Sequence, residues 1–298
     1  MNIGIFGVGS FGEKHIKVIQ NINKFNIIGF HDPDKKKSKD ISKKYKLKYF
    51  ESPINLINKC DAIDIVSNTS THYNILEQCI NLNKNIFIEK PICSSKSELN
   101  KIITKTINYK PIIQVGHIER YNPAIQDGFY NSNNIHSINT YRTGTLNDRN
   151  KNTSITLDLM IHDIDLILSN VQSEITNLNA IGKNKSKNLY NHVECNMQFA
   201  NGMTAQLIAI RNRKIQNERK INIHLLKKII EIDLLNQKQT HIINNDFEIY
   251  NYKKNTNLLE KEFMEFYNCI TNQKKPQVST QEACEAVNIA LKIDEIIN

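Results

Sequence analysis

Short apolar runs alternate with amphipathic stretches through the first 120 residues of the chain. In the stretch 71–81, apolar side chains recur at Ile75, Leu76, Cys79 and Ile80, which together form one face of a helix. Strands that alternate with such helices are typical of βαβ units, whose strands form a parallel sheet. We therefore predict a doubly wound α/β domain over residues 1–120, with strands at 3–6, 26–30, 62–66, 85–88 and 112–115.

After residue 130 the spacing of the apolar positions changes to two. Apolar and polar residues alternate over 193–199 and again over 203–207, and Asn201-Gly202 separates the two runs. Alternation indicates strands with one buried face, and Asn-Gly between them predicts a hairpin with a type I′ turn, which needs a positive φ at both central residues. We expect residues 121–298 to form a second, α+β domain with an antiparallel sheet. Its other predicted elements are strands at 135–144, 220–226 and 229–235 and helices at 257–271 and 280–297.

A complete G-x-G-x-x-G motif, Gly7-Val8-Gly9-Ser10-Phe11-Gly12, follows the first predicted strand and opens an amphipathic helix. Gly7 permits a tight turn, Gly9 lets the backbone approach a pyrophosphate, and Gly12 lets the helix pack closely on the sheet. Asp32 ends the second strand, where a carboxylate accepts hydrogen bonds from the adenosine ribose and repels a 2′-phosphate. The first domain is therefore predicted to be a Rossmann domain that binds NAD. NADP is the less favoured cofactor, which the nearby lysines 35–37 could accommodate.

Candidate catalytic residues occur in two further segments. Glu89-Lys90-Pro91 follows the fourth predicted strand, at the sheet edge where ligands bind in open α/β sheets. Residues 158–165 have a helical pattern, so Asp158, His162 and Asp165 would share one face, and an acid one turn from a histidine can orient it. A solvated lysine and a polar surface helix are the alternatives. No third ligand with a recognisable spacing accompanies these residues, so we expect no metal site.

These motifs, in this order, resemble the Gfo/Idh/MocA family of sugar and cyclitol dehydrogenases over essentially the whole chain. The further landmarks of the resemblance are His15 and Thr69-Ser70-Thr71-His72. The resemblance implies that the second domain is built on a large open antiparallel sheet. Asn68 replaces the family's usual proline, which leaves the loop near the nicotinamide uncertain in detail. The residues implied in cofactor binding are Gly7, Gly9, Ser10, Phe11, Gly12, Asp32, Asn68, Thr69, His72, Glu89 and Lys90.

Residues 116–124 and 158–166 also resemble the members that oxidise the 3-hydroxyl of UDP-N-acetylglucosamine to prepare a 3-amino sugar for lipid A. The resemblance implies that His162 takes the hydroxyl proton, that Lys90 hydrogen-bonds the same oxygen, and that Asp158 orients His162 or the sugar. It also implies that Arg120 binds the diphosphate of a UDP-sugar, with Tyr121 and Asn122 beside it. A dehydrogenase of another sugar or cyclitol, or a non-catalytic NAD-binding protein, are the alternatives.

The bulk composition narrows the class of protein. No apolar run in the 298 residues approaches the ~18 needed to span a membrane, and the chain begins with a strand pattern, so we expect a cytoplasmic protein. The formal charge of +9 comes from dispersed lysines without an aromatic-interleaved basic stripe, so we expect no nucleic-acid partner and a small-molecule substrate. The family resemblance implies a homodimer or homotetramer.

Overall fold

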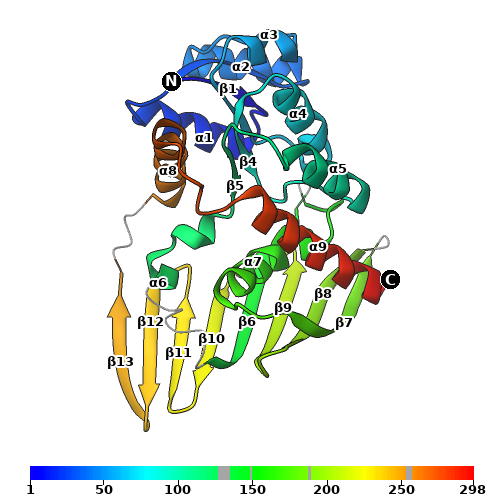
Figure 1. The fold of residues 1–298 in the computed structure, drawn as a ribbon, viewed down its shortest axis with the longest axis vertical. Coiled ribbons are helices and arrows are strands. Elements are labelled where there is room, and N and C mark those ends of the chain that lie inside the picture. Colours follow the sequence, from blue (N-terminus) through cyan, green and yellow to red (C-terminus); the bar gives the residue numbers. More distant parts are fainter. Residues whose placement is uncertain (127–134, 148–149, 187–188, 253–256) are drawn as a thin grey trace. The chain divides into compact units, whose positions relative to one another are not determined.

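The computed structural model describes residues 1–126, 135–147, 150–186, 189–252 and 257–298 (Figure 1). Its contacts divide the chain into two compact units. The first comprises Met1–Ile118 and Asn257–Cys284, and the second comprises Glu119–Thr256 and Glu285–Asn298. Among the described residues, no helix is both long enough and apolar enough to cross a bilayer.

The first unit is a parallel sheet with helices packed on it, which confirms the predicted doubly wound fold. Within its described residues the sheet has five strands in the order β2-β1-β3-β4-β5, and Figure 1 shows the helices around it. The strands are β1 (Asn2–Phe6), β2 (Asn26–His31), β3 (Ala62–Ile65), β4 (Asn85–Glu89) and β5 (Ile113–Gly116). The helices are α1 (Ser10–Asn21), α2 (Lys35–Tyr45), α3 (Pro53–Asn58), α4 (Thr69–Asn81), α5 (Lys96–Thr106) and α8 (Leu258–Asn272).

Helix α8 belongs to the first unit, although its place in the sequence had put it in the predicted domain 121–298. Its Phe263 and Phe266 are fully buried, and Phe263 stacks on Phe87 of β4 with 4.6 Å between ring centroids. Phe25, which follows α1, packs against both phenylalanines of α8. Because these rings complete the core beside the parallel sheet, the chain returns to the first unit after the second sheet is built. Periodicity alone detects the apolar face of α8 but not its partner.

The second unit is built on a large sheet. Within the described residues it has eight strands in the order β13-β12-β11-β10-β6-β9-β8-β7. Neighbouring strands described there run antiparallel except β6 and β9, which pair in parallel from Ser137↔Thr204 onward. The predicted antiparallel sheet is thus confirmed with one parallel pair at its centre. Its strands are β6 (Ile135–Thr145), β7 (Ile175–Ser186), β8 (Leu189–Phe199), β9 (Thr204–Asn212), β10 (Arg219–Leu225), β11 (Lys228–Asp233), β12 (Lys238–Ile243) and β13 (Asp246–Asn251).

The hairpin between β8 and β9 forms where Asn201-Gly202 predicted it, but the turn type differs. Gly202 has φ +85°, whereas Asn201 is outside the positive-φ region, and the N–H of Gly202 donates to the carbonyl of Phe199. This is a type I turn followed by a glycine in the left-handed region, the usual arrangement of a slightly longer hairpin loop. The type I′ assignment was wrong because the loop includes Ala200 as well.

Short helices cover one face of this sheet. A 3₁₀ turn (Ile118–Tyr121) and α6 (Pro123–Gln126) begin the segment, and a π-helical turn (Thr156–Met160) leads directly into α7 (Ile161–Asn170). The π turn contacts β6 and β9, and α7 contacts β9 (Figure 1). The last helix, α9 (Thr280–Ile297), closes the chain. The sheet face beneath the π turn and α7 carries the buried alternate residues of β8 and β9, which include Val193, Cys195, Leu207 and Ala209.

Candidate active site

The glycine-rich loop is tight at two positions and open at the third. Gly7 has φ +95°, and a Cβ there would stand 2.6 Å from the Cα of Ser67. A Cβ on Gly12 would stand 2.2 Å from the Gly7 carbonyl oxygen. A Cβ on Gly9 would meet no atom closer than the Lys37 Nζ at 3.8 Å, and Gly9 is the N-cap of α1 without a side-chain cap. Helix α1 begins with the exposed Ser10 and the half-buried Phe11. Its first-turn amides and the open position at Gly9 together form a cradle for an anion, here called the cofactor cradle.

Asp32 follows β2 and joins this loop to the start of α2. Its Oδ2 accepts the N–H of Val8 at 2.9 Å, and its Oδ1 accepts the N–H of Asp34 at 2.9 Å. Each carboxylate oxygen can accept a further hydrogen bond, so Asp32 retains capacity for ribose hydroxyls. The open cradle at Gly9 and this acceptor beside it fit the pyrophosphate and adenosine ribose of a dinucleotide.

A buried charge cluster lies behind the strand ends. His15 of α1 is fully buried, with Nδ1 3.0 Å from Oδ2 of Asp64 and Nε2 3.4 Å from Oε1 of Glu89. Burial alone would lower the pKa of His15, but the two carboxylates raise it to about 10. The imidazole is therefore charged at neutral pH and bridges Asp64 of β3 to Glu89 of β4.

Glu89 and His72, both predicted to bind cofactor, make hydrogen bonds within the first unit. The other Glu89 oxygen, Oε2, accepts the N–H of Lys90 at 3.3 Å. His72 is 1% exposed, and its ring nitrogens face the carbonyls of Pro91 at 2.8 Å and Ser67 at 3.1 Å. Since these atoms are engaged inside the unit, the two residues brace the turn at Lys90 and the loop at Ser67. Direct contacts of Glu89 and His72 with the cofactor stay a prediction.

Asn68, Thr69 and Lys90 also lie at this edge of the first sheet. Asn68 is the exposed N-cap of α4, Thr69 is its half-buried first residue, and Lys90 is half-buried. Sequence reasoning missed a set of hydrogen bonds among Ser67, Asn68 and Thr71 next to them. Thr71 Oγ1 donates to the Asn68 carbonyl at 2.8 Å and lies 2.7 Å from Ser67 Oγ. These hydrogen bonds fix the conformation of the loop in which Asn68 stands where the family usually has proline.

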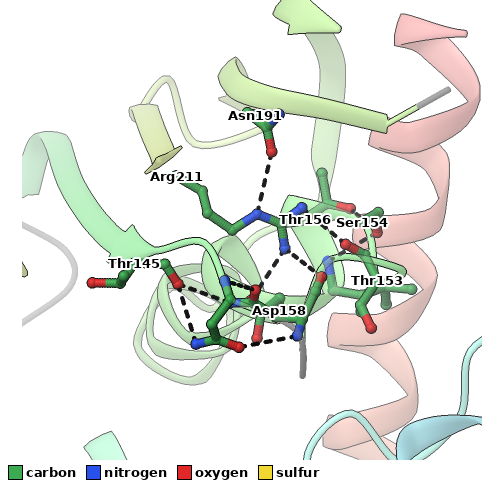
Figure 2. Close-up of polar contacts among 10 residues, drawn as sticks. Thr145, Thr153, Ser154, Thr156, Asp158, Asn191 and Arg211 are labelled. Carbon is green, nitrogen blue, oxygen red and sulfur yellow. Dashed lines mark hydrogen bonds and ion pairs between the residues drawn. The ribbon is translucent and has the colours of Figure 1, made fainter. Parts of the chain in front are cut away.

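In the second unit Asp158 is fixed by a buried arginine that the sequence analysis missed (Figure 2). Arg211 of β9 is 1% exposed, and its Nη1 lies 3.3 Å from Oδ2 of Asp158. The same guanidinium donates to the carbonyls of Asn150 at 2.9 Å and Thr153 at 3.1 Å, and to Oδ1 of Asn191 at 3.4 Å. Arg211 thereby ties β9 and β8 to the segment that enters the π turn and sets the position of the Asp158 carboxylate.

The three residues predicted to share one helix face, Asp158, His162 and Asp165, differ in how deeply they are buried. Asp158 and His162 are half-buried, whereas Asp165 is 1% exposed and accepts two hydrogen bonds from Arg120, at 2.8 Å from Nε and 2.7 Å from Nη2. The Arg120 side chain is 7% exposed. The Arg120 guanidinium thus binds the Asp165 carboxylate inside the unit, and its contact with a diphosphate stays a prediction.

The neighbours of Arg120 are engaged in the same way. Asn122, 1% exposed, donates to the Leu234 carbonyl at 3.0 Å and to Glu119 at 3.2 Å, and Tyr121 is 3% exposed. Residues 120–122 thus lie in the interior of the second unit, and their contacts with substrate stay a prediction. A second ion cluster adjoins them, formed by the buried Glu119, Arg142 and Asp163 and the partly exposed Arg219. Among the described residues, no group of three or more His, Cys, Asp or Glu side chains is arranged to hold a metal ion.

Two family models match the chain. One, described as the oxidoreductase family with an NAD-binding Rossmann fold, matches residues 1–117, and the other, the GFO/IDH/MocA C-terminal domain, matches residues 125–231. The chain is 27% identical over 240 residues to UDP-N-acetylglucosamine 3-dehydrogenase of Acidithiobacillus ferrooxidans, which covers 79% of this chain and 75% of that protein. It is 26% identical over 193 residues to scyllo-inositol 2-dehydrogenase (NAD(+)) of Bacillus subtilis, covering 60% and 56%. A solved structure of the Acidithiobacillus enzyme superposes with a TM-score of 0.91 at 24% identity, over 100% of this chain and 97% of that one.

Proposed function

Because the chain belongs to the Gfo/Idh/MocA family of oxidoreductases, whose Rossmann domain binds NAD, we propose that it oxidises the 3-hydroxyl of UDP-N-acetylglucosamine to the 3-keto sugar. The observation that carries this proposal is the similarity to UDP-N-acetylglucosamine 3-dehydrogenase. That similarity extends over 79% of the chain, and so includes segments of both units. The substrate is the proposed part, whereas the oxidoreductase class and NAD binding follow from the family.

The proposed chemistry assigns one role to each of three groups. Bound NAD supplies the acceptor for the hydride that leaves the sugar carbon. An imidazole nitrogen can accept a proton, and the half-buried His162 takes the hydroxyl proton in the proposal. Lys90 donates to the same oxygen and stabilises the negative charge that develops on it. Proton and hydride leave together as the C–O bond becomes a carbonyl.

Asp158 has a defined place in this scheme because of Arg211. Its carboxylate is pinned through one oxygen by a guanidinium that is itself held by two backbone carbonyls. A carboxylate with little rotational freedom loses little entropy when it orients His162 or a sugar hydroxyl. Asp158 is therefore proposed as the orienting acid of the site.

An inositol dehydrogenase is the second candidate, because the Bacillus scyllo-inositol enzyme is nearly as similar in identity over a shorter part of the chain. NADH formation should be measured with the full chain, NAD and, in turn, UDP-N-acetylglucosamine, UDP-glucose, N-acetylglucosamine, myo-inositol and scyllo-inositol. A parallel assay with an aminotransferase removes the keto product if the equilibrium is unfavourable. Turnover with UDP-N-acetylglucosamine supports the proposal, and turnover with an inositol alone rejects it. NAD binding without turnover on any of them would indicate a non-catalytic protein.

A further inference from the structure

Lys37 lies across the opening of the cofactor cradle. It is the third residue of α2, and its N–H donates to Oδ1 of Asp34 at 3.0 Å, so the backbone from which its side chain extends is fixed. Its Nζ lies 4.0 Å from Oδ2 of Asp32 and 3.8 Å from the place where a Cβ on Gly9 would stand. The ammonium is therefore next to both the ribose acceptor and the open position of the glycine-rich loop.

The two preceding lysines do not share this position. Lys35 is directed to Glu51, with 3.9 Å between Nζ and Oε1, and both side chains are more than three-quarters exposed. Lys36 is exposed. The side chain of Lys37 is 40% exposed, against 10% for Asp32. Within the run 35–37, the ammonium of Lys37 is therefore the one that an ion pair with Asp32 places beside the cradle, whereas that of Lys35 pairs with Glu51.

The pair Asp32 and Lys37 offers a ribose both kinds of partner. The carboxylate of Asp32 accepts hydrogen bonds from free 2′- and 3′-hydroxyls, as NAD requires. A 2′-phosphate carries about two negative charges and would be repelled by an isolated carboxylate at that place. An ammonium 4.0 Å from the carboxylate offsets its charge, and because it is partly exposed it can turn to a phosphate oxygen.

We propose that Lys37 is a cofactor-specificity residue whose ammonium binds the 2′-phosphate of NADP, so that this chain accepts NADP as well as NAD. The inference rests on the dinucleotide-binding part of the proposed function and is independent of the sugar. Lys37 serves this role through its place over the cradle, and the adjacent Lys36, with the same charge, does not.

The test is the dissociation constant of NAD and of NADP, measured by calorimetry on the full chain without any sugar. The variants are Lys37→Ala, Lys37→Arg and, as the matched control, Lys36→Ala. Lys37→Ala should weaken NADP binding about tenfold or more and change NAD binding little, because a charge-assisted contact to one phosphate is lost. Lys37→Arg should retain NADP binding, and Lys36→Ala should leave both constants near those of the unmodified chain.

Two results would overturn the inference. One is an unmodified chain that binds NAD but not NADP, and the other is an equal loss of NADP affinity in Lys36→Ala and Lys37→Ala, which would reflect general charge rather than position. Neither result depends on the substrate. Failure to oxidise UDP-N-acetylglucosamine would reject the proposed substrate and leave these binding constants interpretable.

Discussion

The Nε2 atom of His15 lies 3.4 Å from Oε1 of Glu89, so a histidine on the helix that follows the glycine-rich loop contacts the residue before Lys90. The opposite ring nitrogen contacts Asp64 at 3.0 Å. His15 is thus buried between two acidic side chains, and its imidazolium is the positive charge beside them. The contact connects the cofactor loop to the turn that carries the proposed catalytic lysine, within one unit.

His15→Gln is expected to destabilise the protein by about 3–5 kcal/mol near neutral pH, because removing the cation leaves two buried carboxylates uncompensated. The folded-state pKa of about 10 is above the ordinary value of 6.5. The stabilisation is therefore fully present below about pH 6.5 and is lost as the pH rises toward 10. Urea unfolding of both proteins at several pH values checks this, with the exposed His136→Gln as control. A difference in unfolding free energy that does not shrink with rising pH would contradict the charged state of His15.

The two glycines of the cofactor loop should respond differently to alanine. In Gly12→Ala the new Cβ would stand 2.2 Å from the Gly7 carbonyl oxygen, so the thermal midpoint should fall clearly. In Gly9→Ala the nearest atom is 3.8 Å away, so the fold should be retained. The added methyl would instead occupy the place where a pyrophosphate approaches, and NAD affinity should fall by about tenfold or more. Thermal unfolding and NAD titration of both variants test the pair, and a Gly9→Ala protein with full NAD affinity would argue against the cradle.

Local pattern was sufficient to predict the parallel sheet and the glycine-rich loop. Strand, turn and helix follow one another there within about 30 residues, and each is specified by its own residues. It was insufficient for α8, since an amphipathic helix records that it has a buried face but not what covers it. The partners of Phe263 and Phe266 come from the other end of the chain.

Polar residues were harder to assign than elements. Arg120 is predicted to bind a diphosphate, and Asp165 is predicted only to share a helix face with Asp158 and His162, yet Arg120 and Asp165 pair with each other at 2.7 Å in the interior. The sequence does contain a pattern that would have identified Arg211. The residue occupies the same set of alternate positions as Met203, Ala205 and Leu207, whose side chains are buried. A charged residue at such a position needs a buried partner.

Arg211→Met should be strongly destabilising and should also lower turnover. The substitution leaves the carbonyls of Asn150 and Thr153 without their donor and removes the cation beside Asp158. Breaking such a buried set costs about 3–5 kcal/mol. Arg213→Met is the matched control, because Arg213 lies two residues further along the chain and is exposed, so its effect should stay within about 0.5 kcal/mol. Chemical denaturation of both variants measures the difference, and equal stabilities would show that Arg211 does not hold the π turn.

Lys90→Met and His162→Asn should lower kcat by about 10²–10⁴-fold while NAD binding and thermal stability stay close to those of the unmodified protein. Both side chains are half-buried, whereas those of Phe263 and Arg211 are almost completely buried. Loss of the lysine removes the donor to the reacting oxygen, and loss of the histidine removes the proton acceptor.

The matched controls are the exposed Lys59→Met and His136→Asn, which carry the same chemical changes away from the strand ends and the π turn. Steady-state kinetics with the substrate identified by profiling separates the two effects. If the proton goes to His162, the His162→Asn variant should also lose the fall in kcat at acidic pH that a histidine base produces. Unchanged turnover in a folded, NAD-binding Lys90→Met or His162→Asn protein would show that the reaction relies on other groups.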